Sequence, residues 1–198
     1  MNDSNSKLIQ ERFLNTLLEI ADQVKKNSNT IDTNIVLKLI ELIIEVDSNE
    51  GRIFIYGAGR SGFIGRCFAQ RLMHLSIRSC FISDAVTYRY TKDDLLILIS
   101  GSGETTSPKA IAEEAKRIGG KIVTFTGNSK SSIAMLSDLI INVEGKTKEK
   151  ATSQDSLAPF TSLFDISTLS ILDSIGASLM DLLGITEKDI DQRHASIE

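Results

Sequence analysis

The residues of this sequence most able to do chemistry lie in one short stretch, 100–107, which is rich in hydroxyl groups and glycine. Its hydroxyl side chains are those of Ser100, Ser102, Thr105, Thr106 and Ser107. Glycine lets a backbone approach a ligand closely, and hydroxyl groups can donate hydrogen bonds to an anion. Pro108 fits the first turn of a following helix, whose N-terminus would add partial positive charge. We therefore predict a phosphate-binding loop, the alternative being a Ser/Gly-rich turn in which a hydroxyl only caps the helix.

A second glycine-rich loop, 57–62, has the pattern G-x-G-x-x-G between an apolar run and a helical pattern. Dinucleotide-binding folds use this pattern, and Asp84 lies about where such folds place the acid that binds ribose. Any phosphate-binding turn uses glycine for the same reasons, so the motif alone does not decide between ligands. The hydroxyl-rich loop favours a small phosphosugar held by both loops, because a dinucleotide fold needs no such loop after its third strand. Two tight turns without a ligand remain a further alternative.

The elements that must position these loops alternate along the chain between short apolar runs and amphipathic stretches. Apolar runs typical of buried strands predict strands at 52–56, 79–83, 95–99, 121–126 and 139–143. Helical patterns predict helices at 7–26, 33–48, 63–75, 108–118, 130–136 and 160–183, and a last short helix after a capping-box pattern at 186–189. The alternation predicts a parallel sheet covered by helices on both faces.

Length and composition predict a soluble, cytoplasmic protein of one domain, with N-terminal helices in residues 1–49 and a core in residues 50–198. The net charge of −4, without a Lys/Arg cluster, argues against nucleic acid as a partner. No apolar stretch is expected to approach the roughly 18 residues of a membrane span, and the polar N-terminus does not resemble a signal peptide. The spacing of Cys67 and Cys80 suits neither a zinc site nor a disulfide framework, so we expect buried, reduced thiols and no metal site.

The two loop motifs together resemble the sugar isomerase (SIS) domain family of phosphosugar isomerases and sugar-phosphate-sensing regulators. The resemblance rests on GAGRSG before a helix and ISGSGET after the central strand. The longer stretches FIYGAGRSGFIGRCFAQRLMHL and DDLLILISGSGET, with the terminal QRH, are most similar to the 6-phospho-3-hexuloisomerase branch of that family. The similarity extends over residues 50–194, approximately. It implies a three-layer αβα sandwich with a five-stranded parallel sheet, of flavodoxin-like or Rossmann-like type, preceded by two N-terminal helices.

The resemblance also implies an activity, the interconversion of D-arabino-3-hexulose 6-phosphate and D-fructose 6-phosphate through an enediol and without a cofactor. The expected partner is therefore a sugar phosphate, and the family usually forms tetramers, which would cover apolar faces of the N-terminal helices. The phosphate site that the resemblance implies consists of Ser100, Ser102, Gly103 and Thr105, with Ser61 facing them from the first loop and Gly59 and Arg60 as further substrate-binding candidates.

Moving a carbonyl between C3 and C2 requires a base that removes the C2 proton and an acid that assists at the oxygens. By composition His194 is an unremarkable tail residue, but the resemblance of its Gln-Arg-His context makes it the acid/base candidate, able to act across a subunit boundary. His74 lies in a helical pattern among apolar neighbours, and we predict a hydrogen-bonded core residue there. Arg66 is equally compatible with phosphate binding and with a solvated helix face.

The carboxylate candidate is Asp165, in the stretch 158–165 that precedes the last long helical pattern. Many family members read approximately QPMGSLFE there, so that Asp165 replaces a glutamate that is one methylene longer. This departure leaves the sugar phosphate open, and a polar helix residue without a catalytic role is the alternative. Asp155 and Glu149, in a polar loop at 145–156 that we expect to be mobile, are lesser candidates. A non-catalytic phosphosugar-binding module and an isomerase of another ketose or aldose phosphate are the alternative functions.

Overall fold

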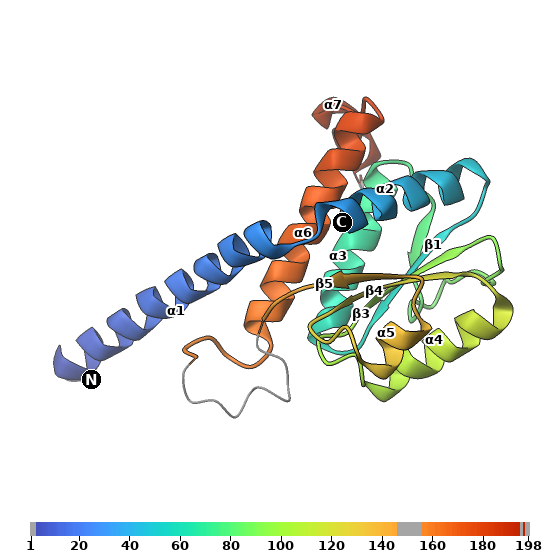
Figure 1. Cartoon of the computed structure of the whole chain (residues 1–198). Coiled ribbons are helices and arrows are strands. Elements are labelled where there is room, and N and C mark those ends of the chain that lie inside the picture. Colours follow the sequence, from blue (N-terminus) through green and yellow to red (C-terminus); the bar gives the residue numbers. More distant parts are fainter. Residues whose placement is uncertain (1–2, 146–155, 195, 197–198) are drawn as a thin grey trace.

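The fold was examined in a computed structural model, which describes residues 3–145, 156–194 and 196. The polar loop predicted at 145–156, with its candidates Glu149 and Asp155, lies almost wholly outside the described residues. In Figure 1 a twisted sheet lies between two layers of helices, and α1 projects away from this body. The described helices are α1 (Asp3–Thr30), α2 (Thr33–Ser48), α3 (Arg60–His74), α4 (Thr106–Ile118), α5 (Ser132–Leu136), α6 (Ser162–Leu182) and α7 (Glu187–Arg193).

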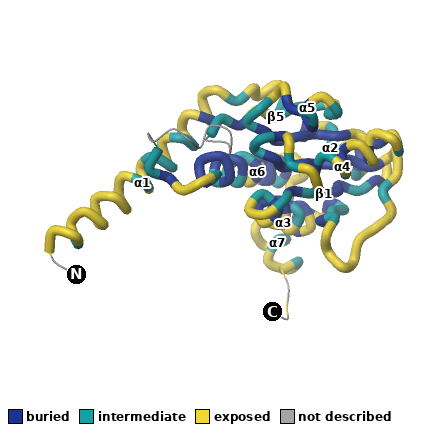
Figure 2. The backbone as a smooth tube through the Cα atoms, turned by 90° about the horizontal axis from the view of Figure 1, so that it is seen from below, coloured by how far each residue is buried: buried dark blue, intermediate teal, exposed yellow. Residues whose placement is uncertain are grey.

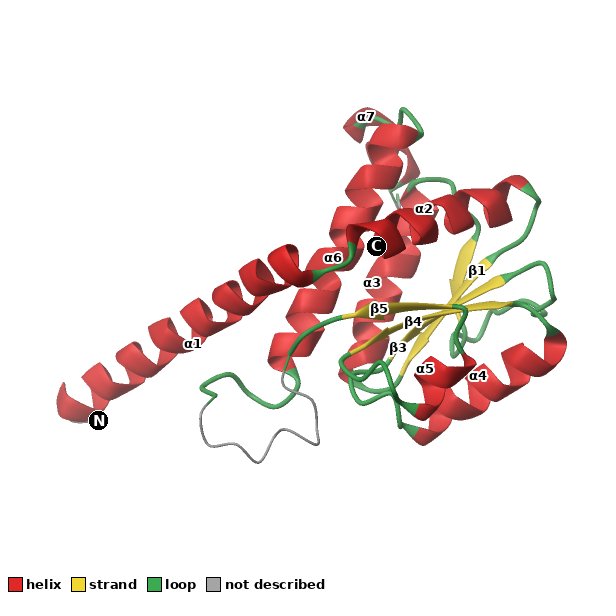
Figure 3. Cartoon of the chain, in the orientation of Figure 1, coloured by secondary structure: helices red, strands yellow, loops and turns green. Residues whose placement is uncertain are grey.

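The sheet has five parallel strands in the order β2-β1-β3-β4-β5 (Figure 3). The strands are β1 (Ile53–Gly57), β2 (Ser79–Phe81), β3 (Leu95–Ile99), β4 (Lys121–Thr126) and β5 (Leu139–Asn142). The central strand β3 is buried along its whole length, as its unbroken apolar run predicts. Gly57 pairs with Ile99 in the register of β1 and β3. The two glycine-containing loops therefore begin side by side, although they are far apart in the sequence.

The period-two alternation of strand side chains divides the core between the two faces of the sheet. On one face, Ile53 and Ile97 pack in a cluster with apolar side chains of α2, α3 and α6. On the other face, Phe54 and Leu96 pack in a smaller cluster with side chains of α4 and α5. The predicted three-layer αβα sandwich with a five-stranded parallel sheet and two preceding helices is confirmed.

The first helix, α1, contacts α6, and its N-terminal half extends beyond the body (Figures 1 and 2). The buried side chain of Asn27 forms two hydrogen bonds with the backbone of Glu144. Asn27 Nδ2 donates to the Glu144 carbonyl oxygen, and Asn27 Oδ1 accepts from the Glu144 N–H, both at 2.8 Å. This pair joins α1 to the chain just after β5. An apolar face of the projecting half remains exposed, formed by Leu8, Ile9, Phe13, Leu14, Leu17 and Leu18.

Two expectations from composition are wrong. Cys67 is exposed, not buried, and Cys80 is only partly buried. Cys67 lies one turn after the exposed Phe63 on α3, on the side of that helix that does not pack against the sheet.

The second wrong expectation concerns apolar stretches, because α6 is long and apolar enough, by length and composition, to cross a membrane. α6 contacts α1, α2 and α3, and half of its apolar segment is buried. Its apolar composition is therefore explained by packing within the fold.

Candidate functional site

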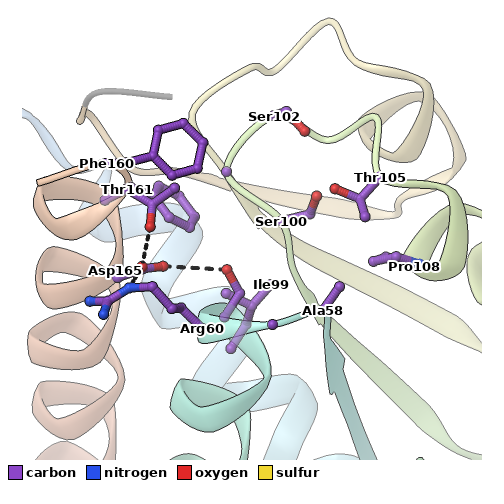
Figure 4. A pocket seen from close by; sticks show the side chains of 14 residues that line it. Ala58, Arg60, Ile99, Ser100, Ser102, Thr105, Pro108, Phe160, Thr161 and Asp165 are labelled. Carbon is purple, nitrogen blue, oxygen red and sulfur yellow. Dashed lines mark hydrogen bonds and ion pairs between the residues drawn. The ribbon is translucent and has the colours of Figure 1, made fainter. Parts of the chain in front are cut away.

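A cavity of about 250 Å³ opens at the carboxyl ends of β1 and β3 (Figure 4). Its lining comes from three separate segments, 58–61 after β1, 99–108 after β3 and 160–165 at the start of α6. The chain leaves β1 toward β2 on one side and leaves β3 toward β4 on the other, so the cavity lies where the strand order reverses. Open α/β sheets characteristically bind ligands at such a switch point.

The hydroxyl-rich loop forms one wall of the cavity, and local hydrogen bonds orient its serines. Ser100 Oγ accepts from the Gly103 N–H at 3.2 Å, and Ser102 Oγ accepts from the Glu104 N–H at 3.2 Å. Each hydroxyl still has its own proton to donate to a ligand. Gly103 has φ of 68°, and a Cβ there would lie 1.9 Å from Ser131 Oγ. The loop can therefore take this shape only with glycine at position 103.

Glu104 belongs to the same loop but does not line the cavity. Its carboxylate accepts from Ser132 N at 2.7 Å and from Ser132 Oγ at 2.6 Å, and these hydrogen bonds lower the pKa of Glu104. The two bonds tie the loop to the first turn of α5. Glu104 therefore stabilises the loop on the side that faces away from the cavity.

Three helices begin at the cavity, and none of them has a side-chain N-cap. The N-cap residues of α3, α4 and α6 are Gly59, Thr105 and Thr161, and none accepts a capping hydrogen bond with its side chain. Side chains cap three helices that begin elsewhere, at Asp32 for α2, Ser131 for α5 and Thr186 for α7. The alternative of a turn whose hydroxyl only caps the following helix is therefore wrong, because the side chain of Thr105 caps nothing. Uncapped N-termini present backbone donors and partial positive charge, which suits an anionic ligand.

Asp165 lies on the wall opposite the hydroxyl-rich loop and is 2% exposed. Oδ2 accepts from Arg60 Nε at 2.8 Å and from Thr161 Oγ1 at 2.6 Å, and Oδ1 accepts from Ser61 Oγ at 3.3 Å. All three donors line the cavity themselves. The predicted residues Ser61, Arg60 and Asp165 are thus brought together, and Ser61 contacts the carboxylate within this chain. Gly59 also lies in the lining, at the N-cap of α3.

Several lining residues were not predicted as site residues, among them Phe160, Thr161 and Phe164. Phe160 is half exposed at the rim, on the side of Asp165 (Figure 4). Thr161 has φ of 66° and ψ of −11°, a left-handed conformation that β-branched residues rarely adopt. Only the spacing of four residues between Thr161 and Asp165 could have indicated their contact, since a positive φ at threonine leaves no sequence signal.

His194 is not in this cavity. Its ring stacks on His74, with centroids 5.4 Å apart. His74 ends α3, whereas Arg60 and Ser61 begin that helix at the cavity. Fifteen helical residues span about 20 Å, so the His74–His194 pair lies at the opposite end of the helical layer from the cavity. Within one chain, the structure does not bring His194 and Asp165 together.

His74 is buried, as predicted, but its ring is not fully hydrogen-bonded. Its Nε2 has no hydrogen-bond partner among the described residues, and its backbone oxygen accepts from Arg193 Nη1 at 2.8 Å. Burial lowers the pKa of His74, with further lowering by the charges of His194 and Arg71. The prediction that His74 is buried in the core is confirmed, and the prediction that it is hydrogen-bonded is wrong for Nε2.

Arg66 and Asp84 also lie outside the cavity lining. They form an ion pair of 2.8 Å, and the guanidinium of Arg66 lies over the ring of Phe81 at 4.0 Å. Asp84 is thus engaged away from the cavity, which removes one of the two features that favoured a dinucleotide. Among the described residues, no group of three His, Cys, Asp or Glu side chains is placed to hold a metal ion.

Comparison with known proteins places this geometry in a family. A family model described as the SIS domain matches residues 48–170. The chain is 40% identical over 159 residues to a 3-hexulose-6-phosphate isomerase of Methanocaldococcus jannaschii, covering 80% of this chain and 82% of that protein. It is 31% identical over 196 residues to a 3-hexulose-6-phosphate isomerase of Mycobacterium gastri, covering 99% and 96%. A solved structure from Methanococcus jannaschii, for which that same isomerase function was inferred, matches with a TM-score of 0.78 and 36% identity, covering 93% of this chain and 98% of that one.

Proposed function

Because the chain belongs to the SIS domain family, we propose that it is a phosphosugar isomerase that interconverts D-arabino-3-hexulose 6-phosphate and D-fructose 6-phosphate. Relatives named 3-hexulose-6-phosphate isomerase match most of the chain's length. Three uncapped helix N-termini meeting at one hydroxyl-rich cavity are the observation that supports a phosphosugar ligand most strongly.

The phosphate group of the substrate binds at the wall formed by Ser100, Ser102 and Thr105, while Gly103, which does not line the cavity, gives the loop its shape. The hydroxyl protons of the serines and the N-terminus of α4 are the donors that this wall offers. A phosphate held there places the sugar chain in the remaining cavity, toward Asp165 and Arg60 (Figure 4). Each hydrogen bond to a charged group contributes about 1.5–3 kcal/mol, so the phosphate supplies much of the binding energy.

The carbonyl moves between C3 and C2 at the opposite wall. A base removes the C2 proton of the 3-ketose, and the electrons form a 2,3-enediol as the acid protonates the C3 oxygen. The proton on the C2 oxygen then leaves to the acid while the base returns its proton to C3, which leaves the carbonyl at C2. Asp165 is our candidate for the base, and Arg60 stabilises negative charge that develops on the oxygens. These steps move protons only and require no cofactor. His194 is the candidate for the acid, supplied by the tail of a neighbouring subunit.

Association of several copies accounts for the faces that this chain leaves uncovered. The projecting half of α1 exposes six large apolar side chains, Leu8, Ile9, Phe13, Leu14, Leu17 and Leu18, all more than half exposed. Contiguous apolar patches of this kind mark interaction sites. We propose a homo-oligomer, a tetramer or dimer of dimers, in the cytoplasm, where a phosphorylated sugar and free thiols are both expected.

Two measurements on the purified protein test this function. The first is conversion of D-arabino-3-hexulose 6-phosphate to fructose 6-phosphate, run beside a panel of other ketose and aldose phosphates. The second is the melting temperature with fructose 6-phosphate, with NAD and with NADP, because a ligand of the native state raises it by mass action. Stabilisation by the sugar phosphate without turnover of any panel member would favour a non-catalytic sensing module. Stabilisation by NAD alone would favour a dinucleotide enzyme.

A further inference from the structure

The backbone of Thr161 has a left-handed conformation, and its hydroxyl bonds to a side chain in the first turn of α6 and not to the backbone there. Thr161 precedes α6 in the N-cap position, where a threonine ordinarily accepts a hydrogen bond from the first turn. Here φ is 66° and Oγ1 instead donates to Asp165 Oδ2 at 2.6 Å. A β-branched residue in this region stores strain, which persists only where the surrounding structure enforces it.

Two hydrogen bonds from α1 hold the segment that leads into Thr161. Glu19 Oε2 accepts from the Ala158 N–H at 2.6 Å, and Arg12 Nη2 donates to the Leu157 carbonyl oxygen at 2.8 Å. Both contacts join residues more than a hundred positions apart in sequence. They fix the backbone three and four residues before Thr161, and Ala158 itself is 5% exposed. The segment that ends in Thr161 is therefore held at one end by α1 and at the other by α6.

We propose that Thr161 is a positioning residue for Asp165, and that α1 keeps Thr161 in place through Glu19 and Arg12. The inference rests on the proposed function, in which Asp165 is the base. A carboxylate must reach the C2 proton within hydrogen-bond distance, and the Asp165 side chain can otherwise rotate. Arg60 restrains it weakly because the Arg60 side chain is 61% exposed, and Ser61 Oγ donates to the other oxygen at the longer distance of 3.3 Å. Thr161 is the donor at 2.6 Å that comes from a fixed backbone.

Substitutions at Thr161 separate its hydroxyl from its shape. Thr161→Val keeps the branched shape and removes the donor, so kcat should fall at least about tenfold while KM changes less than about threefold. Thr161→Ser keeps the donor and should retain most of the wild-type kcat. A purely structural role would instead lower the melting temperature of both variants and leave kcat of the folded protein unchanged.

Substitutions in α1 test the second link with a matched control. Glu19→Ala removes the acceptor for the Ala158 N–H, and kcat should fall about fivefold or more with little change in KM. Glu19→Gln keeps an acceptor oxygen and should restore much of that loss. Glu11→Ala changes an exposed carboxylate of the same helix and should leave kcat at the wild-type value.

The Arg60 Nε–H resonance, assigned with Arg60→Lys, reports the position of Asp165 without any turnover. It should shift in Thr161→Val and Glu19→Ala and stay unchanged in Glu11→Ala. Wild-type protein without isomerase activity would refute the proposed function, and the resonance shifts would still support the positioning role. An active wild type whose Thr161→Val variant has unchanged kcat and an unchanged Arg60 resonance would overturn the inference for Thr161. The same two results for Glu19→Ala would overturn it for α1.

Discussion

Arg60 and Asp165 lie 105 residues apart in the sequence, yet Nε of Arg60 donates a hydrogen bond of 2.8 Å to Oδ2 of Asp165. Asp165 is almost completely buried, whereas the Arg60 side chain is largely exposed. A fixed carboxylate and an accessible guanidinium thus share one wall of the cavity (Figure 4). This pairing is suited to a reaction in which a proton leaves carbon while negative charge develops on a neighbouring oxygen.

Asp165→Asn should lower kcat by roughly 10²–10⁴, the usual contribution of a positioned base. KM should change little, because the opposite wall holds the phosphate independently. Steady-state kinetics with the 3-hexulose phosphate measure both. Asp173→Asn is the matched control, since Asp173 lies on the same helix and pairs with Arg71 outside the cavity. Equal kcat values for Asp165→Asn and wild type would require another base, first to be sought at Asp155 or Glu149.

Ser102→Ala combined with Thr105→Ala should weaken sugar-phosphate binding by several kcal/mol, since hydrogen bonds to a charged group contribute roughly 1.5–3 kcal/mol each. The fold should persist, because both side chains lie in the lining of the cavity and outside the hydrophobic core. Calorimetric titration with fructose 6-phosphate measures the loss. Thr106→Ala, at an exposed neighbour outside the lining, should bind as the wild type does. An unchanged affinity in the double variant would remove this loop from the site.

His194→Ala should lower kcat by roughly 10²–10⁴ if the tail supplies the acid. Because His194 stacks on His74, away from the cavity of its own chain, it must act in a neighbouring subunit. A mixture of His194→Ala and Asp165→Asn chains, unfolded and refolded together, should then regain activity that neither variant has alone. Mixed oligomers form in which one site takes its base and its acid from different chains. Wild-type kcat for His194→Ala would exclude the tail from the reaction.

Stability should fall as the pH decreases through the usual histidine value of 6.5, in part because of His74. Burial, His194 and Arg71 lower the pKa of His74 in the folded protein, so the unfolded chain binds the extra proton more readily. This contribution is fully favourable above pH 6.5 and is lost as the pH falls toward the folded pKa. Urea unfolding between about pH 8 and about pH 5 should show a smaller loss for His74→Phe than for wild type. Equal losses would assign the pH dependence to other groups.

The fold was predictable because each strand and helix carries its own periodicity. The limits of β3 and β4 match the apolar runs at 95–99 and 121–126, and the capping box at Thr186 forms as its spacing predicts. The predicted helix at 108–118 began two residues late, although Pro108 does lie in the first turn of α4 as expected. α1 begins at Asp3, four residues before the predicted start at residue 7, because polar residues also continue a helix.

The segments that line the cavity could be predicted from the sequence, but most of the contacts between them could not. Motif spacing identified both loops and Asp165, but it could not show that Ser61 contacts Asp165. That contact depends on where α6 crosses the sheet, a tertiary property with no local signal, whereas the contact of Thr161 with Asp165 lies within the first turn of α6. The exposure of Cys67 was missed for the same reason, because a small apolar residue on a helix does not reveal which face packs.

The initial rate at which purified protein forms fructose 6-phosphate from D-arabino-3-hexulose 6-phosphate, measured in a coupled assay, decides whether this cavity is an isomerase site. We expect steady turnover by the wild type without added cofactor, with kcat/KM reduced at least about a hundredfold in the Ser102→Ala, Thr105→Ala double variant. A wild type that forms no fructose 6-phosphate, or a double variant as active as the wild type, would show that the activity or its location is wrong.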